Sequence, residues 1–195
     1  METWAIILAA GESRRMQKNK LLLPFQNKSL IELVVEHVTQ AGIDNIMLVL
    51  GAYRDDILPV ISRMPVKHCY NKDYEQGMLS SLQCGLRNIP PSMDVAIIFL
   101  GDQPAIPGEV ALALIKEYRQ SEKGIVIPVH DGKRGHPVLI HKRYRKEIEE
   151  LNLAEGLRGL MRKFPQDIIE VEVDFPEILK DIDVPKDYLD LTNSK

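Results

Sequence analysis

Residues 5–20 read AIILAAGESRRMQKNK, an apolar run that ends in small residues and continues into a loop rich in cations. Two further runs have the same form, IMLVL at 46–50 and VAIIFL at 95–100, and a glycine follows each of the three. Short, continuous apolar runs are typical of strands that are covered on both faces in a parallel sheet. We therefore expect these three runs to lie in one parallel sheet.

Helical patterns separate these runs. Ser29-Leu30-Ile31-Glu32 is a capping-box pattern, and apolar residues at helical spacing follow it as far as Gly42, so the first two runs frame a βαβ unit. The sequence predicts further strands at 66–70, 124–129, 136–141 and 168–174, and helices at 78–88, 108–120, 143–151 and 154–164. No linker or repeat interrupts the chain. We therefore expect one α/β domain over residues 1–195, a three-layer α/β/α Rossmann-like fold with a mostly parallel sheet.

Composition narrows the classes of function. The 195 residues are 45% hydrophobic and 27% charged, with a formal net charge of −3. No basic stripe is present, so nucleic acid is a poor partner. The apolar stretch at 4–10 is too short to cross a bilayer, so no membrane partner is expected. Cys69 and Cys84 form no CxxC pattern, which favours a cytoplasmic protein and leaves open whether the two pair.

Three polar loops follow the predicted strands, at 11–20, 51–55 and 101–104. Ligands of open α/β sheets bind in the crevice at the carboxyl ends of the strands. In the first loop, small residues at 9–11 let a ligand approach the backbone, and Arg14, Arg15 and Lys20 can contact phosphate oxygens. The loop matches neither the P-loop nor the dinucleotide fingerprint. A simple turn with solvated cations is an equally open interpretation.

The third polar loop places Asp102 directly after a strand, in Gly101-Asp102-Gln103-Pro104. A carboxylate at this edge can bind Mg²⁺, which prefers hard oxygen ligands and bridges carboxylates to substrate phosphates. We choose Asp183, in KDIDVP at 180–185, as the second carboxylate. Taken singly, Asp102 also fits an ordinary turn residue and Asp183 a cap for the tail segment.

The order LAAGESRRM…K, GDQP, RGHP and DIDVP resembles the MobA-like NTP transferase family, and within it the molybdenum cofactor cytidylyltransferase branch. The resemblance runs from Ile6 to about Leu189 and implies the nucleotide-diphospho-sugar transferase type of fold. It implies a Mg²⁺-dependent nucleotidyltransferase that transfers CMP from CTP, or from another NTP, to the phosphate of a molybdopterin-type cofactor. Pyrophosphate would leave, and a client molybdoenzyme would be a further partner.

The resemblance also implies roles for single residues. The backbone of Leu8, Ala9, Ala10 and Gly11 would contact base and ribose, and the catalytic group would be Arg14, Arg15, Lys20 and the metal ligand Asp102. A second nucleotide loop would supply Asn71, Gly77, Ser80 and Ser81, and the acceptor would meet His136 and Arg158. Three of these residues also fit a plainer interpretation: Ser80 as a helix cap, His136 as a packing residue and Arg158 as a solvated cation.

The sequence departs from the family pattern at two positions and leaves other functions open. Gln17 replaces a usual glycine after the Arg-Met pair, and Val184 replaces a threonine after Asp183. Ala10 stands where the guanylyltransferase branch has glycine, which favours CTP. The alternatives are guanylyl transfer, transfer to a sugar or alcohol phosphate, and a non-catalytic module that carries nucleotide or cofactor to a molybdoenzyme. A nicotinamide-dependent oxidoreductase is disfavoured because GxGxxG is missing.

Overall fold

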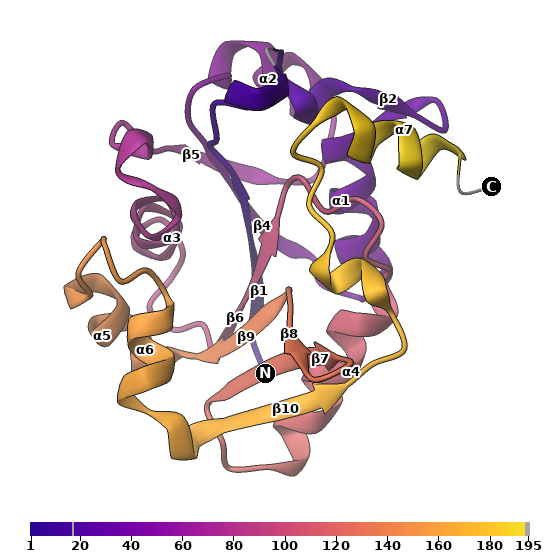
Figure 1. Cartoon of the computed structure of the whole chain (residues 1–195). Helices are drawn as coiled ribbons and strands as arrows, with labels where there is room; N and C mark the ends of the chain where they lie inside the picture. The colour runs from indigo at the N-terminus through magenta and orange to yellow at the C-terminus, as the bar shows by residue number, and fades with distance from the viewer. Residues whose placement is uncertain (17, 194–195) are drawn as a thin grey trace.

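The computed structural model describes residues 1–16 and 18–193, which form an eight-stranded sheet with helices on both faces (Figure 1). The strand order is β10-β7-β9-β6-β1-β4-β5, with β8 paired to β7. Neighbours run parallel except where β9 meets β6 and β7 and where β8 meets β7. The strands are β1 (Thr3–Ala9), β4 (Asn45–Leu50), β5 (Lys67–Tyr70), β6 (Val95–Leu100), β7 (Ile125–His130), β8 (Lys133–Arg134), β9 (Val138–His141) and β10 (Ile168–Glu172).

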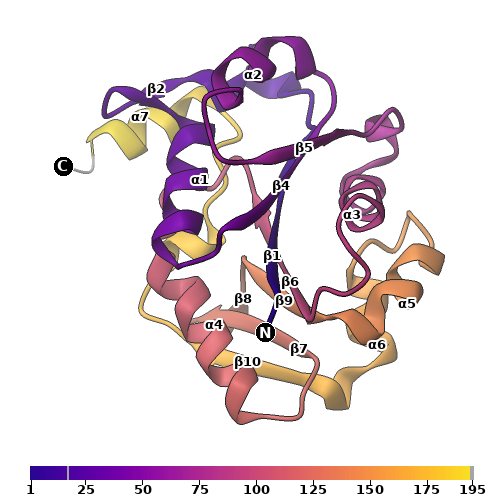
Figure 2. The ribbon, with the colours of Figure 1, turned by 180° about the vertical axis from the view of Figure 1, so that it is seen from behind.

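The helices complete three layers. On one face lie α1 (Leu30–Gln40), α2 (Arg54–Ile61) and α4 (Gly108–Gln120), with α7 (Pro185–Asn193) beside α1; on the other lie α3 (Met78–Arg87), α5 (Arg145–Glu150) and α6 (Arg158–Lys163) (Figures 1 and 2). A small hairpin, β2 (Pro24–Phe25) and β3 (Lys28–Ser29), precedes α1. The predicted three-layer α/β/α architecture with a mostly parallel sheet is confirmed.

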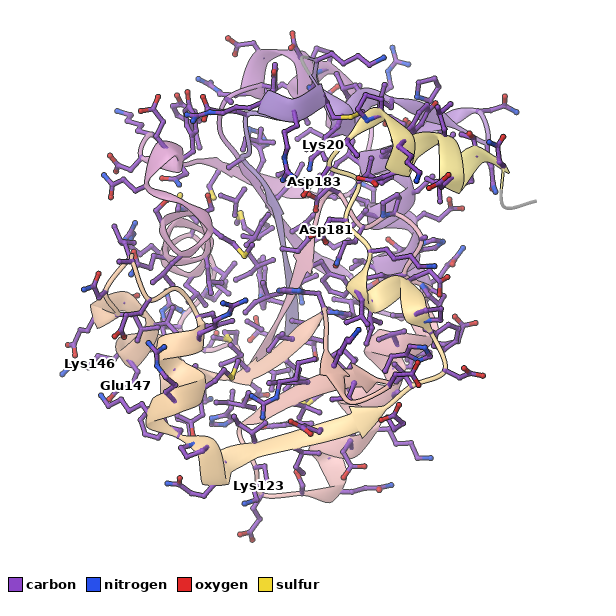
Figure 3. The ribbon with its side chains drawn as sticks, viewed as in Figure 1. Lys20, Lys123, Lys146, Glu147, Asp181 and Asp183 are labelled. Carbon is purple, nitrogen blue, oxygen red and sulfur yellow. The ribbon has the colours of Figure 1, made fainter. Side chains whose placement is uncertain are left out.

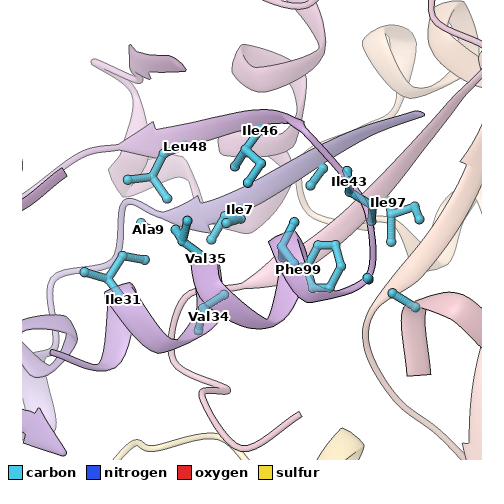
Figure 4. Packing of buried hydrophobic residues seen from close by; sticks show 14 of the residues in the cluster. Ile7, Ala9, Ile31, Val34, Val35, Ile43, Ile46, Leu48, Ile97 and Phe99 are labelled. Carbon is cyan, nitrogen blue, oxygen red and sulfur yellow. The ribbon is translucent and has the colours of Figure 1, made fainter. Parts of the chain in front are cut away.

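Buried side chains on both faces of β1 explain the layering. Ile7 packs with Val35 of α1 and Leu48 of β4 (Figure 4). The preceding residue, Ile6, packs on the opposite face of the sheet with Leu82 of α3. Successive strand residues point to opposite faces, so a continuous apolar run needs helices on both sides. The predicted capping box starts α1, where Glu32 Oε2 accepts hydrogen bonds from the backbone nitrogen of Ser29 at 2.7 Å and from its hydroxyl at 2.6 Å.

The predicted segments agree with the structure apart from a few differences. α6 begins at Arg158 instead of 154, because residues 153–157 form turns and Gly156 has a φ of 60°, in the left-handed region. β10 ends at Glu172 instead of 174, and α2 and α7 were not predicted. α2 contains Pro59, which argues against a helix on local grounds. That residues 1–195 form one domain stays a prediction.

Two further expectations concern the cysteines and membranes. Cys69 and Cys84 are free and buried, with their sulfur atoms 3.6 Å apart. In the described part of the chain, no helix has both the length and the apolar character that crossing a membrane requires.

Candidate active site

A pocket of about 480 Å³ opens where the loops after β1 and β6 meet. We call it the Gly11 pocket. Its lining includes most of the side chains and backbone that the sequence selected for nucleotide, phosphate and metal: Leu8, Ala9, Ala10, Gly11, Arg14, Arg15, Lys20, Gly77, Ser81, Asp102 and Asp183. The fold therefore brings together residues that lie up to 175 positions apart in the sequence.

The loop after β1 is held in place by the loop after β4. The backbone nitrogen of Ala52 donates to the carbonyl oxygen of Ala10 at 3.2 Å, and the Tyr53 hydroxyl donates to the carbonyl oxygen of Glu12 at 2.9 Å. Gly51 permits this approach, since a Cβ there would lie 2.4 Å from the Ala10 oxygen. The turn itself falls at Ser13, whose φ is 49°. Gln17, the departure from the family glycine, lies outside the described residues.

Gly11 has neither of the usual structural reasons to be glycine. Its φ is not in the left-handed region, and a Cβ built on it would have no heavy atom of the described chain within 4 Å. The plain interpretation of Gly11 as a residue that a tight turn requires therefore fails. Its missing side chain instead leaves space in the wall of the pocket, where a ligand can contact the backbone.

Lys20 joins the two carboxylates chosen for the metal. Its Nζ lies 2.6 Å from Asp102 Oδ2 and 2.9 Å from Asp183 Oδ1, and the Lys20 side chain is 11% exposed. Figure 3 shows Lys20 and Asp183 close together beyond the end of β1, with Asp181 nearby, whereas the labelled Lys123, Lys146 and Glu147 lie at the periphery. Asp102 and Asp183 belong to distant segments, so their meeting at one cationic atom is a tertiary feature.

The ion pairs shift the titration of these groups. Burial alone would lower the pKa of Lys20, but the nearby Asp102 and Asp183 raise it overall, so the amine stays protonated. Burial acts to raise the pKa of Asp183, but the hydrogen bond and charge of Lys20, with the charge of Arg15, lower it overall. Lys20 and Asp183 are therefore both ionised near neutral pH.

The two arginines of the first loop are held more loosely. Arg15 Nη2 lies 2.6 Å from Asp183 Oδ2, and Arg14 Nη2 lies 2.6 Å from Glu12 Oε2. Their side chains are 67% and 77% exposed, respectively. Exposed ion pairs contribute at most about 1 kcal/mol, so both guanidinium groups can exchange a carboxylate for a phosphate at small cost.

The predicted second nucleotide loop divides into two parts. Gly77 and Ser81 line the Gly11 pocket. Asn71 and Ser80 are buried and do not: Asn71 Nδ2 donates to the hydroxyls of Ser80 and Ser81 at 2.9 and 3.0 Å, and Ser80 Oγ bonds to the carbonyl oxygens of Asp73 and Gly77. Direct contact of Asn71 and Ser80 with nucleotide stays a prediction. The hydrogen bonds observed are those of a scaffold for the start of α3.

Sequence reasoning missed Asp181, Tyr74 and Met78, which also line the pocket. Asp181 accepts a hydrogen bond from Gln103 Nε2 at 2.7 Å. Partial burial of its carboxylate, together with the charge of Asp102, raises its pKa. The spacing of DIDV could have indicated it, because residues two apart in an extended segment lie on the same side, as Asp181 and Asp183 do around the buried Ile182.

A second and larger cavity, of about 1030 Å³, adjoins the Gly11 pocket and shares Leu8 and Met78 with it. We call it the His136 groove. It is lined by His136 and Arg158, the two predicted acceptor residues, and by Arg134, Arg162 and apolar side chains of residues 153–161. Burial lowers the pKa of His136, although the charge of Asp102 acts in the opposite direction, so the imidazole is neutral at pH 7. Arg158 is exposed and forms no ion pair with another described residue.

The residues around Lys20 fit a divalent cation. Among the described residues no group of three or more His, Cys, Asp and Glu side chains forms a complete metal site. Asp102 and Asp183 nevertheless each present one carboxylate oxygen to Lys20 Nζ, so the two carboxylates lie side by side in the pocket. Two carboxylates with open positions are the donor set that Mg²⁺ uses when substrate phosphates complete its coordination.

A family model and known proteins match large parts of this chain in sequence. The family model for the MobA-like NTP transferase domain matches residues 5–168. The molybdenum cofactor cytidylyltransferase of Escherichia coli (strain K12) is 29% identical over 94% of this chain and 92% of its own. A probable molybdenum cofactor guanylyltransferase of Natranaerobius thermophilus is 32% identical over 66% of this chain and 60% of its own.

Solved structures agree on the fold. Rv0371c from Mycobacterium tuberculosis H37Rv is 23% identical and superposes with a TM-score of 0.87 over 98% of both chains. A structure of Rv0371c in complex with manganese gives a TM-score of 0.79 over the whole of both chains at 22% identity.

Proposed function

Because this chain belongs to the MobA-like NTP transferase family, we propose that it transfers the CMP group of CTP to the phosphate of a molybdopterin-type cofactor and releases pyrophosphate. The observation that carries the proposal is the meeting of Asp102 and Asp183 at Lys20 Nζ, beside the space at Gly11. The similarity to the molybdenum cofactor cytidylyltransferase of Escherichia coli supports this acceptor class.

The proposed reaction needs no protein nucleophile. An oxygen of the acceptor phosphate attacks the α-phosphorus of CTP in line, a new P–O bond forms, and the bond from the α-phosphorus to the oxygen that bridges it to the β-phosphorus breaks. The electron pair of that bond leaves with pyrophosphate. Positioning and charge stabilisation are the usual sources of catalysis in such transfers.

The residues divide this work between them. Lys20 is fixed by two carboxylates and places one ammonium charge at the phosphates, whereas Arg14 and Arg15 can exchange their exposed ion pairs for phosphate oxygens. Asp102 and Asp183 would hold Mg²⁺, which when bound neutralises charge on the phosphate oxygens. His136 lines the His136 groove, is close enough to Asp102 to sense its charge, and would contact the acceptor.

The choice of base rests on Ala10. Its methyl group, which a glycine would lack, would narrow the pocket and disfavour a purine base. A single methyl group discriminates between two such substrates by only about 1 to 3 kcal/mol. Ala10 is 5% exposed and packs against Gly51, which favours the lower end of that range. Transfer of GMP is therefore the second candidate, and the similarity to the probable guanylyltransferase favours it.

One experiment separates these functions. Pyrophosphate release would be measured with each of the four ribonucleoside triphosphates, with and without the pterin acceptor. We expect CTP to give the highest rate and the rate to require the acceptor. Fastest turnover with GTP would overturn the choice of base, and turnover with sugar or alcohol phosphates in place of the pterin would overturn the choice of acceptor.

A second test addresses catalysis itself. Asp102→Ala removes one of the two carboxylates and is expected to abolish measurable Mg²⁺-dependent pyrophosphate release, whereas Asp44→Ala, an exposed aspartate before β4, serves as the matched control. Near-wild-type turnover by Asp102→Ala would sink the assignment. Binding of CTP by the wild-type protein without release of pyrophosphate would favour the alternative of a carrier module for a client molybdoenzyme.

The cytoplasmic location, which rests on the use of cysteine, also stays a prediction.

A further inference from the structure

Residues 176–184 contribute Asp181 and Asp183 to the lining of the Gly11 pocket. We call them the 176–184 strap. Apolar residues anchor it twice: Ile178, which is buried beside Ile106 and Val110, and Ile182, which is buried beside Met16 and Leu33. The backbone between these anchors carries the carboxylates toward the pocket.

Backbone hydrogen bonds reinforce the same two anchors. The carbonyl oxygen of Ile178 accepts from the backbone nitrogen of His136 at 3.2 Å, and the backbone nitrogen of Ile182 donates to the carbonyl oxygen of Asp102 at 3.0 Å. Asp187 Oδ2 accepts from the backbone nitrogens of Asp183 and Val184, both at 2.8 Å. Between Ile178 and Ile182, the backbone nitrogen of Lys180 donates to the carbonyl oxygen of Glu177 at 3.1 Å, and a side chain from another loop also reaches this stretch.

That side chain is Gln103, in the loop after β6. Its Nε2 donates to Asp181 Oδ1 at 2.7 Å and to the carbonyl oxygen of Ile178 at 3.4 Å. Gln103 is 5% exposed, and its Oε1 is buried without a hydrogen-bond partner among the described residues. Both partners of Nε2 are acceptors, which dictates the orientation of the amide even though it leaves Oε1 unsatisfied.

An unsatisfied buried oxygen is unfavourable for folding, and a leucine would fill a similar volume without it. Packing alone therefore does not explain a glutamine at position 103. The contact that requires an amide is the one to Asp181. Asp102, the neighbour of Gln103 in the chain, faces Lys20 from the same loop.

We infer that Gln103 is a positioning residue, whose amide fixes the 176–184 strap so that Asp183 stays opposite Asp102 across Lys20. Gln103 touches neither the space at Gly11 nor Lys20 in the structure, and it acts through Asp181 and the backbone of the strap. The part of the inference that concerns metal rests on the proposed function, whereas the part that concerns the order of the strap does not.

The test compares two equally buried glutamines. Gln83 is 8% exposed, and its Nε2 donates to the carbonyl oxygens of Ile148 and Glu149 on the far side of the sheet. Gln83→Leu therefore makes the same chemical change as Gln103→Leu, with a similar loss of buried hydrogen bonds, but away from the strap. Both variants are expected to remain folded, which their thermal unfolding would verify.

The first readout is amide hydrogen exchange in the protein without ligand. We expect Gln103→Leu to raise exchange in residues 179–184 above wild type, and Gln83→Leu to leave that stretch unchanged. Exchange there that stays at the wild-type level in Gln103→Leu overturns the inference. Exchange that rises equally in both variants overturns it as well, because it shows general destabilisation.

The second readout is CTP binding by calorimetry as a function of Mg²⁺ concentration. Loss of a residue that orients a metal ligand costs about 10-fold to 100-fold in metal affinity, so we expect Gln103→Leu to need about tenfold more Mg²⁺. Asp181→Asn keeps an acceptor for the amide, so hydrogen exchange in residues 179–184 of this variant should stay at the wild-type level. Asp181→Leu should behave like Gln103→Leu, and the double variant should be no worse than either single one.

The two failures can be told apart. A wild-type protein that binds no CTP in the presence of Mg²⁺ contradicts the proposed function, while the exchange data still decide whether Gln103 orders the strap. Additive losses in the double variant, or hydrogen exchange in residues 179–184 that rises as far in Asp181→Asn as in Asp181→Leu, contradict the inference while CTP binding by the wild type stands.

Discussion

The Gly11 pocket and the His136 groove share a wall at Leu8 and Met78, yet they hold their charges differently. In the pocket, Lys20 is buried between two carboxylates whose positions are fixed by the fold. In the larger groove, Arg158 is exposed and forms no ion pair with another described residue, and His136 is neutral. Preorganised charge suits a group common to every substrate of a reaction class, whereas an exposed arginine beside apolar surface suits recognition of one particular acceptor.

The largest effect that would test this contrast is the loss of the fixed charge. We expect Lys20→Ala to lower the rate of pyrophosphate release about 100-fold or more, as removal of one preorganised donor does elsewhere. The substitution also leaves Asp102 and Asp183 facing each other without the intervening ammonium. Lys18→Ala, an exposed cation of the same loop, is the control. A loss below tenfold in Lys20→Ala would show that the pocket does not depend on its buried cation.

A smaller and selective effect is expected in the groove. Arg158→Ala should raise KM for the acceptor about tenfold, the scale of one hydrogen bond to a charged group, and leave KM for CTP unchanged. Initial rates with each substrate varied in turn measure both constants, with Arg119→Ala on α4 as the control. Equal changes in both constants would mean that the two cavities do not act separately.

The neutral state of His136 predicts a pH dependence of stability. Because the pKa of His136 is lowered in the folded protein, the unfolded chain binds the proton more readily. The free energy of unfolding therefore decreases as the pH falls below the ordinary histidine pKa of about 6.5. The share of His136 in this slope is at most about 1.4 kcal/mol per pH unit. Urea unfolding of wild type and His136→Gln between pH 5 and 8 measures it. The variant should lose less stability on acidification, and parallel curves would contradict the assigned state.

The smallest effect is expected where one loop braces another. Tyr53→Phe removes the hydrogen bond from its hydroxyl to the carbonyl oxygen of Glu12. A net hydrogen bond contributes about 0.5 to 1.5 kcal/mol, so KM for CTP should rise about twofold to tenfold while KM for the acceptor stays constant. Tyr118→Phe, on the remote helix α4, provides the comparison. No change in KM for CTP would mean that the loop after β1 holds its shape without the brace.

Within the Gly11 pocket, the sequence predicted the strand ends better than the contacts between loops, for a physical reason. Strands β1 and β6 are continuous apolar runs, and the residues after such runs must lie at one edge of a parallel sheet, which placed Gly11 and Asp102 correctly. The brace at Tyr53 and the strap contact at Asp181 depend on loops that meet only in the folded chain. The spacing of DIDV could have indicated Asp181, but no local pattern indicates its contact with Gln103 or that of Tyr53 with Glu12, so sequence reasoning selected neither residue.

The helices show the same limit. The prediction for α1 succeeded because Ser29 and Glu32 mark its start. The helix α2 was not predicted because Pro59 argues against a helix on local grounds, whereas the buried Ile57 and Ile61 stabilise α2 through tertiary packing. Asn71 and Ser80 were predicted as nucleotide contacts, but in the structure Asn71 Nδ2 donates a hydrogen bond to Ser80 Oγ. Whether such groups face a ligand or a scaffold is decided by side-chain orientation.

The reversed direction of β9 has a consequence for how such a crevice can diversify. β9 runs against β6 and β7, so the residues that enter it, Gly135 and His136, arrive at the same edge that the other strands leave. The exposed turn between β7 and β9, residues 131–134, can thus change sequence without altering the ends of β1 and β6. The loops after β1 and β6 would then keep the proposed triphosphate chemistry, while the turn between β7 and β9 could change to fit other acceptors.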